Sequence, residues 1–173
     1  RDVFTADDRW NIVILRYFNP AGAHESGLIG EMYGKSPSNI VPLLALAANG
    51  DIPYFRVLGT GYNTPDGTGI RDYIHITDLA NGHVMAIKKL YSQPNVYTYN
   101  LGTGRGYSVL ETIKAFEKAS GREIPYKIET ARDGDIAEMY ACSDKAREEL
   151  GWTAKYGIED ICRSAWNWHN KIY

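Results

Sequence analysis

The sequence predicts an α/β fold, in which strands and helices alternate along the chain. Apolar runs such as "NIVILRY" and "VYTYNL" alternate with segments whose apolar residues recur at helical spacing. The continuous run "NIVILRY" is typical of a strand buried on both faces, inside a parallel sheet that helices cover. The 173 residues are enough for one ordinary domain or for one lobe of a larger protein.

In the first part of the chain we expect, in order, a strand at 12–17, a turn-rich loop at 19–39, a helix at 40–49, a strand at 54–59 and a glycine-rich loop at 60–69. The helix has Pro42 in its first turn and Gly50 as its C-terminal stop. The loop at 19–39 is long enough to carry function and not only to connect two elements.

A strand at 72–76 should lead into a helix at 79–91 that Thr77 or Asp78 caps. The apolar residues of this helix predict one buried face, made of Leu79, Val84, Ile87 and Leu90.

A strand at 96–101 precedes the glycine-rich turn "GTGRG". Ser108 and Glu111 then form a capping box, which predicts a helix up to Ser120 that Gly121 ends.

The remaining elements are a strand at 124–129, a charged loop at 130–135 and a short helix at 144–150 that stops at Gly151. A last helix starts near Ile158. Its helical spacing places six residues on one packing face: Ile158, Ile161, Cys162, Ala165, Trp166 and His169.

Composition excludes several classes of protein. The net charge is −2 with both signs interspersed, so we expect no nucleic-acid partner. No apolar run approaches about 18 residues, so no membrane span is expected. Cys142 and Cys162 lack the spacing of metal ligands, which favours reduced thiols in a cytoplasmic protein.

The beginning of the chain is unusual. It does not start with Met, and only a polar stretch precedes "NIVILRY". A buried central strand needs a neighbour on each side. We therefore expect the chain to lack the N-terminal part of a longer protein.

One segment imitates a dinucleotide-binding unit. A strand, the glycines Gly102, Gly104 and Gly106, a capped helix and a strand ending in Glu129 follow one another. The spacing is GxGxG and not GxGxxG, however, and the segment lies late in the chain. A non-catalytic nucleotide-binding module that uses this turn is the alternative it leaves open.

The stretch "RDYIHITDLANGH" suggests a metal or hydrolytic site, because His75, Asp78 and His83 lie close together. No HExxH, cysteine cluster or GxSxG is present. We expect no metal, with His75 as a buried strand residue. Arg71 and Arg132 lie in or beside glycine-rich loops, where arginines either clamp phosphates or form solvated ion pairs; their spacing favours neither reading.

Four segments together resemble the C-terminal half of UDP-glucose (UDP-galactose) 4-epimerases, which belong to the extended short-chain dehydrogenase/reductase superfamily. They are "LRYFNPAGAH", "GTGIRDYIHITDLANGH", "YNLGTGRGYSVLE" and "RDGDIAEMYACSDKAREELGW". The resemblance implies that residues 1–20 are the last part of an NAD-binding Rossmann domain that is mostly missing. It implies that residues 21–173 form the UDP-sugar-binding C-terminal α/β domain, with about 71–101 packing back onto the Rossmann sheet.

The resemblance also implies roles for individual residues. Tyr17 and Phe18 would lie beside the nicotinamide end of NAD, and Asn19 would hydrogen-bond the substrate diphosphate. Asn39, with Ile40 at the start of a helix, would donate to phosphate.

On the uridine side, backbone groups and an apolar contact from Arg56, Val57 and Leu58 would receive uracil. Arg71 and Arg132 would clamp the pyrophosphate, Asp135 would accept from the ribose hydroxyls, and Met139 would border the sugar pocket. Many family members have Phe where Leu58 stands, and Tyr or a small residue where Met139 stands.

The function implied is interconversion of UDP-galactose and UDP-glucose through an NAD-dependent 4-keto intermediate, a step of galactose metabolism. The catalytic Ser/Thr and Tyr-x-x-x-Lys are expected upstream, so no catalytic residue is assigned here and the chain alone should be inactive. The whole protein is expected to be a homodimer. The alternative within the superfamily is another NAD-dependent nucleotide-sugar epimerase, dehydratase or decarboxylase.

Overall fold

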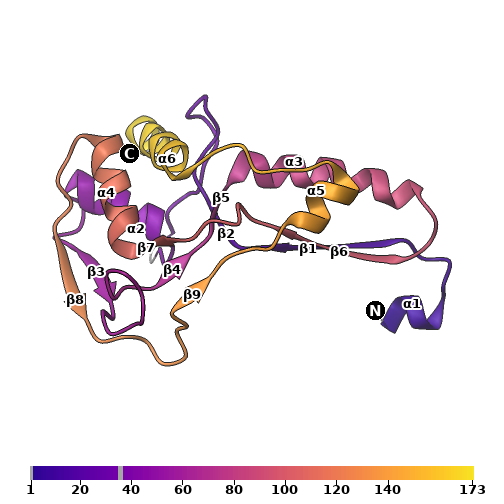
Figure 1. Cartoon of the computed structure of the whole chain (residues 1–173). Helices are drawn as coiled ribbons and strands as arrows, with labels where there is room; N and C mark the ends of the chain where they lie inside the picture. The colour runs from indigo at the N-terminus through magenta and orange to yellow at the C-terminus, as the bar shows by residue number, and fades with distance from the viewer. Residues whose placement is uncertain (1, 35–36) are drawn as a thin grey trace.

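The computed structural model describes residues 2–34 and 37–173; part of the predicted loop at 19–39, residues 35 and 36, lies outside the described residues. The elements are α1 (Asp2–Ala6), β1 (Ile12–Tyr17), β2 (Asn19–Ala21), α2 (Ile40–Asn49), β3 (Phe55–Leu58), β4 (Ile70–Arg71), β5 (Tyr73–His75), α3 (Ile76–Ile87), the 3-10 turn η1 (Lys88–Tyr91), β6 (Val96–Leu101), β7 (Tyr107–Ser108), α4 (Val109–Ser120), β8 (Tyr126–Glu129), β9 (Glu138–Met139), α5 (Asp144–Leu150) and α6 (Ile158–Ile172). The predicted α/β class is confirmed (Figure 1).

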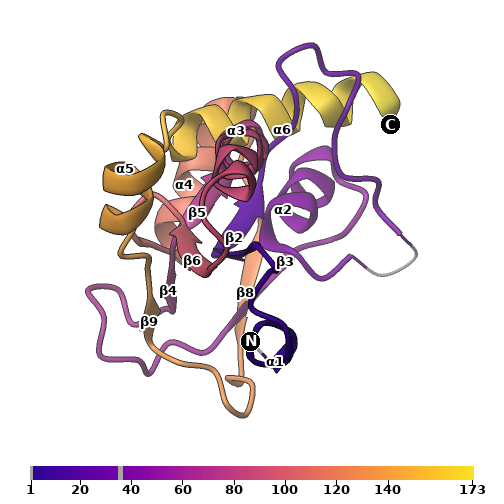
Figure 2. The ribbon, with the colours of Figure 1, turned by 90° about the vertical axis from the view of Figure 1, so that its right-hand side faces the viewer.

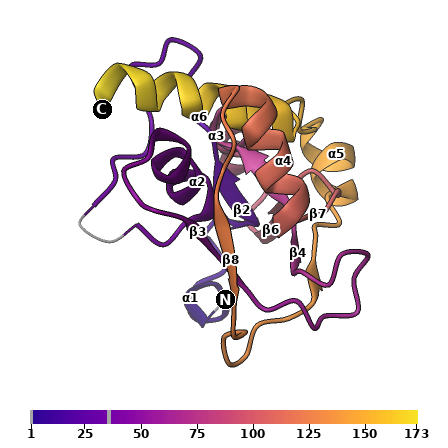
Figure 3. The ribbon, with the colours of Figure 1, turned by 90° about the vertical axis from the view of Figure 1, so that its left-hand side faces the viewer.

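The strands form small separate sheets. β1 pairs with β6, β2 with β5 and β3 with β8, each pair in parallel. β4 lies between β7 and β9, antiparallel to the first and parallel to the second. β8 runs at the outer edge of the molecule, in front of α2 and α4 (Figure 3).

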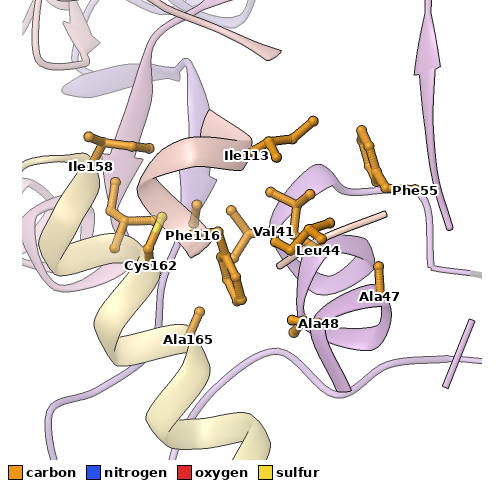
Figure 4. Close-up of a cluster of buried hydrophobic side chains, with 14 of the residues drawn as sticks. Val41, Leu44, Ala47, Ala48, Phe55, Ile113, Phe116, Ile158, Cys162 and Ala165 are labelled. Atoms are coloured by element: carbon orange, nitrogen blue, oxygen red, sulfur yellow. The ribbon is translucent and has the colours of Figure 1, made fainter. Parts of the chain in front are cut away.

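The main hydrophobic core lies between α2, α4 and α6 (Figure 4). All three predicted stops are confirmed, because Gly50, Gly121 and Gly151 adopt the left-handed backbone that ends α2, α4 and α5. The predicted capping box is present: Ser108 Oγ accepts from the N–H of Glu111, whose carboxylate accepts from the N–H of Ser108. These local signals set where the core helices begin and end.

A second core lies beside the β1–β6 pair, under α3 and α5. Its buried residues are Ile74, Leu79, Tyr99, Leu101, Ala146 and Trp152. Both helices lie on the same side of the two strands (Figures 1 and 2). The expectation that β1 is buried on both faces is wrong for the described residues: Ile12 to Leu15 are half-buried, and Arg16 and Tyr17 are exposed. The reason is that α3 and α5 lie on one side of the β1–β6 pair (Figures 1 and 2) and that, among the described strands, β1 pairs with β6 only.

The predicted cap and buried face of α3 are both wrong. The helix begins at Ile76, and its cap is His75, whose Nδ1 accepts from the N–H of Thr77. Asp78 does not cap, because its carboxylate accepts from the N–H groups of Lys155 and Tyr156. Of the predicted apolar face only Leu79 is buried. Val84 (61% exposed) and Ile87 (49%) lie on the exposed side of α3, and Leu90 (45%) lies beyond it in η1.

Most of the packing face predicted for the last helix is confirmed, with Ile158, Ile161, Cys162, Ala165 and His169 buried in α6. Trp166 is only half-buried, and the buried tryptophan of α6 is Trp168. Among the described residues no helix is both long and apolar enough to cross a membrane.

Candidate functional site

A cavity of about 610 Å³ opens between β2, the segment that follows it, and the first turns of α2 and α3. Three residues of the predicted site line it: Asn19, Asn39 and Ile40. Asn19 donates its backbone N–H to the carbonyl of Asp72 at 2.9 Å, which fixes it beside β5. Its side-chain oxygen Oδ1 is buried, and no described residue bonds to it. An unpaired amide atom at a cavity wall is available to a polar ligand.

Asn39 stands at the start of α2 without capping it, since its side chain makes no bond to the helix. Its amide donates instead to Glu31 Oε1 at 2.8 Å, across the cavity mouth. The first N–H groups of α2 therefore do not donate to the side chain of the cap residue, and such groups favour an anion.

Arg71, Arg132 and Asp135 form one charged cluster. Arg132 Nε lies 3.1 Å from Asp135 Oδ2, and Arg71 Nη2 lies 3.8 Å from Asp135 Oδ1. Arg71 is the more enclosed arginine, because its side chain is 19% exposed and that of Arg132 is 65% exposed. Met139 lies next to this cluster, since β4 and β9 pair with Arg71 opposite Met139.

The three uracil candidates lie on β3. Arg56 is exposed and pairs with Glu129 of β8, which raises its pKa through the hydrogen bond and the charge of that carboxylate. Val57 is buried in the main core, so only its backbone can face a ligand, and Leu58 is half-buried. Among the described strands β3 pairs along one edge only, with β8, so backbone groups of its other edge remain available.

These groups are joined by short structural links. A Cβ added at Gly59, next to β3, would lie 2.7 Å from Ala131 Cβ, so the end of β3 packs on the loop that carries Arg132. Asp72, next to Arg71, holds the backbone of Asn19. The structure therefore links Asn19 to the segment that carries Arg71, and the end of β3 to the loop that carries Arg132.

Tyr17 and Phe18 lie at the carboxyl end of β1. The hydroxyl of Tyr17 lies 3.3 Å from His83 Nε2. The ring of Phe18 contacts Gly102, where an added Cβ would lie 3.2 Å from Phe18 Cδ2. The carboxyl ends of parallel strands are where open α/β sheets bind their ligands.

Asp72 is a buried residue whose role the sequence reasoning missed. Its carboxylate accepts hydrogen bonds from the N–H and the hydroxyl of Thr103, from the N–H of Gly104 and from the N–H of Ala141. Two backbone donors of the "GTG" turn, the N–H groups of Thr103 and Gly104, are thus occupied by protein. The glycines serve close packing too, because a Cβ at Gly102 would lie 2.5 Å from Ala141 Cβ. This arrangement contradicts the dinucleotide-unit reading of the turn.

No pattern in the sequence marked Asp72 as different from other aspartates in strands or loops. The four groups that donate hydrogen bonds to its carboxylate lie 31 to 69 residues away in the sequence. The "DGTG" loop has a similar internal role. Asp66 accepts from Thr68 and from the hydroxyl of Ser108, which ties this loop to the start of α4.

The histidine-rich stretch forms no metal cluster among the described residues. His75 is buried, and since its Nδ1 accepts from Thr77, its Nε2 carries the proton of the neutral ring. Nε2 therefore donates to Ser164 Oγ at 3.1 Å, and Ser164 donates to the carbonyl of Ile161. A histidine that donates to the serine cannot act as its base, so this pair is structural. Burial lowers the pKa of His75.

Comparison with known proteins gives a consistent result. Residues 4–165 match the family model described as GDP-mannose 4,6 dehydratase. The chain is 55% identical to the UDP-glucose 4-epimerase of Bifidobacterium longum over 99% of its length and 50% of the relative, and 52% identical to that of Bacillus subtilis over 98% and 50%. The chain thus spans about half the length of these curated relatives.

Solved structures agree with this result. The B. longum UDP-glucose 4-epimerase in complex with NAD+ and UDP superposes with a TM-score of 0.95 at 55% identity, over 99% of this chain and 51% of that one. The UDP-Glc/GlcNAc 4-epimerase of Campylobacter jejuni superposes with a TM-score of 0.79 at 34% identity, over 99% of this chain and 52% of that one.

Proposed function

Because the chain belongs to the family described as GDP-mannose 4,6 dehydratase, we propose that it is the UDP-sugar-binding part of an NAD-dependent UDP-glucose 4-epimerase. The observation that carries this proposal is the Arg71–Asp135–Arg132 cluster, in which Arg71 directly precedes Asp72, the residue that holds the backbone of Asn19. It occurs in a chain that is 55% identical to a UDP-glucose 4-epimerase over 99% of its length.

The cluster suits a diphosphate. Two guanidinium groups share one carboxylate, so the positive charge exceeds the negative charge by one before a ligand arrives. A guanidinium fork matches two phosphate oxygens, and charge-assisted bonds of this kind are the strong ones. Binding through UDP, remote from the reacting carbon, leaves the sugar ring free to present either face while the intermediate stays bound.

NAD is the proposed cofactor, which supplies the hydride acceptor when it is bound. Tyr17 and Phe18 fit its nicotinamide end, since they stand at the carboxyl end of a parallel strand and the side chain of Tyr17 is exposed. The "GTG" turn does not fit its phosphates, because Asp72 already accepts from Thr103 and Gly104 there.

We further propose the division of the chain into residues 1–20, as the last part of a Rossmann domain, and 21–173, as the substrate domain. About 71–101 would pack back onto the Rossmann sheet. The β1–β6 pair and the second core support this last part, because they join Val13 and Leu15 to Leu79, Tyr99 and Leu101, and the exposed apolar side of α3 is where the rest of the whole protein would pack. A homodimeric, cytoplasmic enzyme is part of the proposal.

The decisive assay is conversion of UDP-galactose to UDP-glucose by the whole protein with NAD. Turnover that is lost in Arg71→Ala supports the assignment, with Arg163→Ala as the control, because Arg163 forms an exposed ion pair with Asp160 on α6. Retained UDP binding without this turnover would instead favour a second candidate, a related NAD-dependent nucleotide-sugar dehydratase, decarboxylase or other epimerase. The description of the family model as a dehydratase is the observation that keeps this candidate.

A further inference from the structure

The segment of residues 22–33, here called the wall segment, follows β2 and runs alongside the C-terminal part of α6 (Figure 2). Five of its residues line the 610 Å³ cavity: Gly22, His24, Ile29, Gly30 and Glu31. The wall segment contains no helix and no hydrogen-bonded strand beyond its start. Its position must therefore be set by contacts with its neighbours.

Those contacts come largely from one side of α6. Side chains of four helix residues, and of the residue after the helix, bond to backbone atoms of the wall segment. The pairs are Ser164 with the N–H of Ala23, Asn167 with the carbonyl of Glu25, Lys171 with the carbonyl of Ser26, Trp168 with the carbonyl of Glu31, and Tyr173 with the N–H of Tyr33.

Trp168 contacts the wall segment both by packing and by a hydrogen bond. Its side chain is buried, with the residue 6% exposed, yet it belongs to neither of the two hydrophobic cores of the described residues. The indole packs instead on Gly30, where an added Cβ would lie 2.5 Å from Trp168 Cγ. Its Nε1–H donates to the carbonyl of Glu31 at 3.0 Å. Asn167 and Lys171 make their bonds in exposed positions, where water competes.

Trp168 holds the backbone of Glu31, which lines the cavity. Glu31 accepts the amide of Asn39 at 2.8 Å, and Asn39 stands at the start of α2. A displacement of Glu31 would therefore change where the Asn39 amide points, without any contact between Trp168 and a ligand.

We propose that Trp168 is a positioning residue of the nucleotide-sugar site, which sets the Glu31–Asn39 pair through the backbone of the wall segment. This inference rests on the function proposed above. It assigns to the end of α6 a role in ligand binding in addition to its packing role in the main core.

The test uses the whole protein and a matched pair of variants, Trp168→Phe and Trp166→Phe. Both replace a tryptophan of α6 with a smaller aromatic ring. Trp166 packs on Phe116 and His169 and makes no hydrogen bond to the wall segment. Loss of one neutral hydrogen bond predicts a rise of about threefold to tenfold in the KM for UDP-galactose in Trp168→Phe, with kcat changed less than about twofold. Trp166→Phe keeps the KM of the wild type.

Two further measurements separate positioning from a general loss of packing. Amide hydrogen exchange of residues 23–33 should become faster in Trp168→Phe and not in Trp166→Phe. In an Asn39→Ala background the Trp168→Phe change should no longer raise KM, because the pair through which it acts is gone.

Equal KM values in the wild type and Trp168→Phe, or an undiminished effect in the Asn39→Ala background, would overturn the inference while the wild-type enzyme is active. A wild-type protein with neither turnover nor UDP binding is a different result, since it refutes the proposed function and this inference with it. If Trp168→Phe does not fold, Gly30→Ala is the second variant. Its new Cβ would push the backbone of the wall segment away from the indole and should raise KM alike.

Discussion

The positive side chain of Arg71 is largely enclosed, and its carboxylate partner, Asp135, lies far away in the sequence. The Arg71 side chain is 19% exposed and its Nη2 lies 3.8 Å from Asp135 Oδ1, while its Nη1–H donates to the carbonyl of Ile70. This geometry leaves donors of the planar fork without a close carboxylate. Lys cannot reproduce the fork. We therefore expect Arg71→Lys to weaken UDP binding about tenfold or more in calorimetric titration of the whole protein.

Arg163→Lys is the control for Arg71→Lys, because the exposed Arg163 bonds only to Asp160 one helical turn away. Its UDP affinity should equal that of the wild type. Equal affinities in both lysine variants would remove Arg71 from the binding site.

Met139 lies opposite Arg71 in the β4–β9 pair and is part-exposed, so its side chain borders the region of the charged cluster. Met is flexible and intermediate in size between Tyr and a small residue. We expect Met139→Tyr to reduce turnover of UDP-GlcNAc, whose N-acetyl group needs room, while turnover of UDP-glucose is kept. Steady-state assays with both substrates measure this, and equal UDP-GlcNAc rates in the two proteins would refute the steric argument.

His169 is a buried histidine with both ring nitrogens unpaired, stacked among Tyr33, Trp166 and Tyr173. Burial lowers its pKa below the ordinary value of 6.5, although Asp51, 3.8 Å away, acts in the opposite direction. The folded state thus prefers the neutral ring. The stability this provides is complete above the pKa of the unfolded chain and is lost as pH falls toward the lower pKa of the folded protein.

The wild type should therefore lose more unfolding free energy than His169→Phe when the pH falls from about 7 to about 5. Urea denaturation at both pH values measures the difference. His75, whose pKa is also lowered by burial, is present in both proteins and cancels in the comparison. The same loss in both proteins would show that His169 does not titrate in this range.

At the scale of elements, the starts of α4 and α2 have different roles, the first in stability and the second in binding. Ser108 caps α4 and also donates to Asp66, whereas Asn39 begins α2 without capping it. Ser108→Ala should cost about 1 kcal/mol of unfolding free energy or more. Asn39→Ala should cost little stability and weaken UDP binding. Thermal denaturation and UDP titration of both variants check this, and a reversed pattern would contradict it.

Elements fixed by local signals were predictable from the sequence. The capping box at Ser108 and the stops at Gly50 and Gly121 depend on residues within one turn, and the helices begin and end where these signals place them. The buried side of α3 was not predictable in this way. Apolar spacing marks a face that packs on something, but it does not say whether the partner belongs to the described chain, so Val84 and Ile87 are exposed.

The site was predictable only where the resemblance reached it. Asn19, Arg71, Arg132 and Asp135 were assigned by resemblance. The structure joins the last three in one charged cluster and bonds the backbone of Asn19 to Asp72, while their contacts with a ligand stay a prediction. Asp72 and Trp168 act through segments far away in the sequence, 31 residues or more for Asp72 and 137 for Trp168. No local pattern records such contacts, because they exist only once the strands and α6 have been placed.

At the scale of the whole molecule, Asp72 stands where the two cores meet. It follows β4, holds the turn after β6 and bonds to Ala141 beyond β9. A carboxylate that accepts four bonds occupies the N–H groups of Thr103 and Gly104, which a phosphate of NAD would otherwise use. A diphosphate would have to displace a buried charge, which is costly when its partners are not replaced.

We therefore expect the 173-residue chain alone to bind no NAD in the micromolar range and to lack epimerase turnover, since it contains no Tyr-x-x-x-Lys. Fluorescence titration with NAD, and with UDP as the comparison ligand, measures the first expectation. Weak UDP binding without NAD binding fits a substrate domain whose cofactor site lies mostly in the rest of a longer protein. Micromolar NAD affinity that Thr103→Pro abolishes would instead establish the turn as a nucleotide site, and the non-catalytic module would then replace the epimerase assignment.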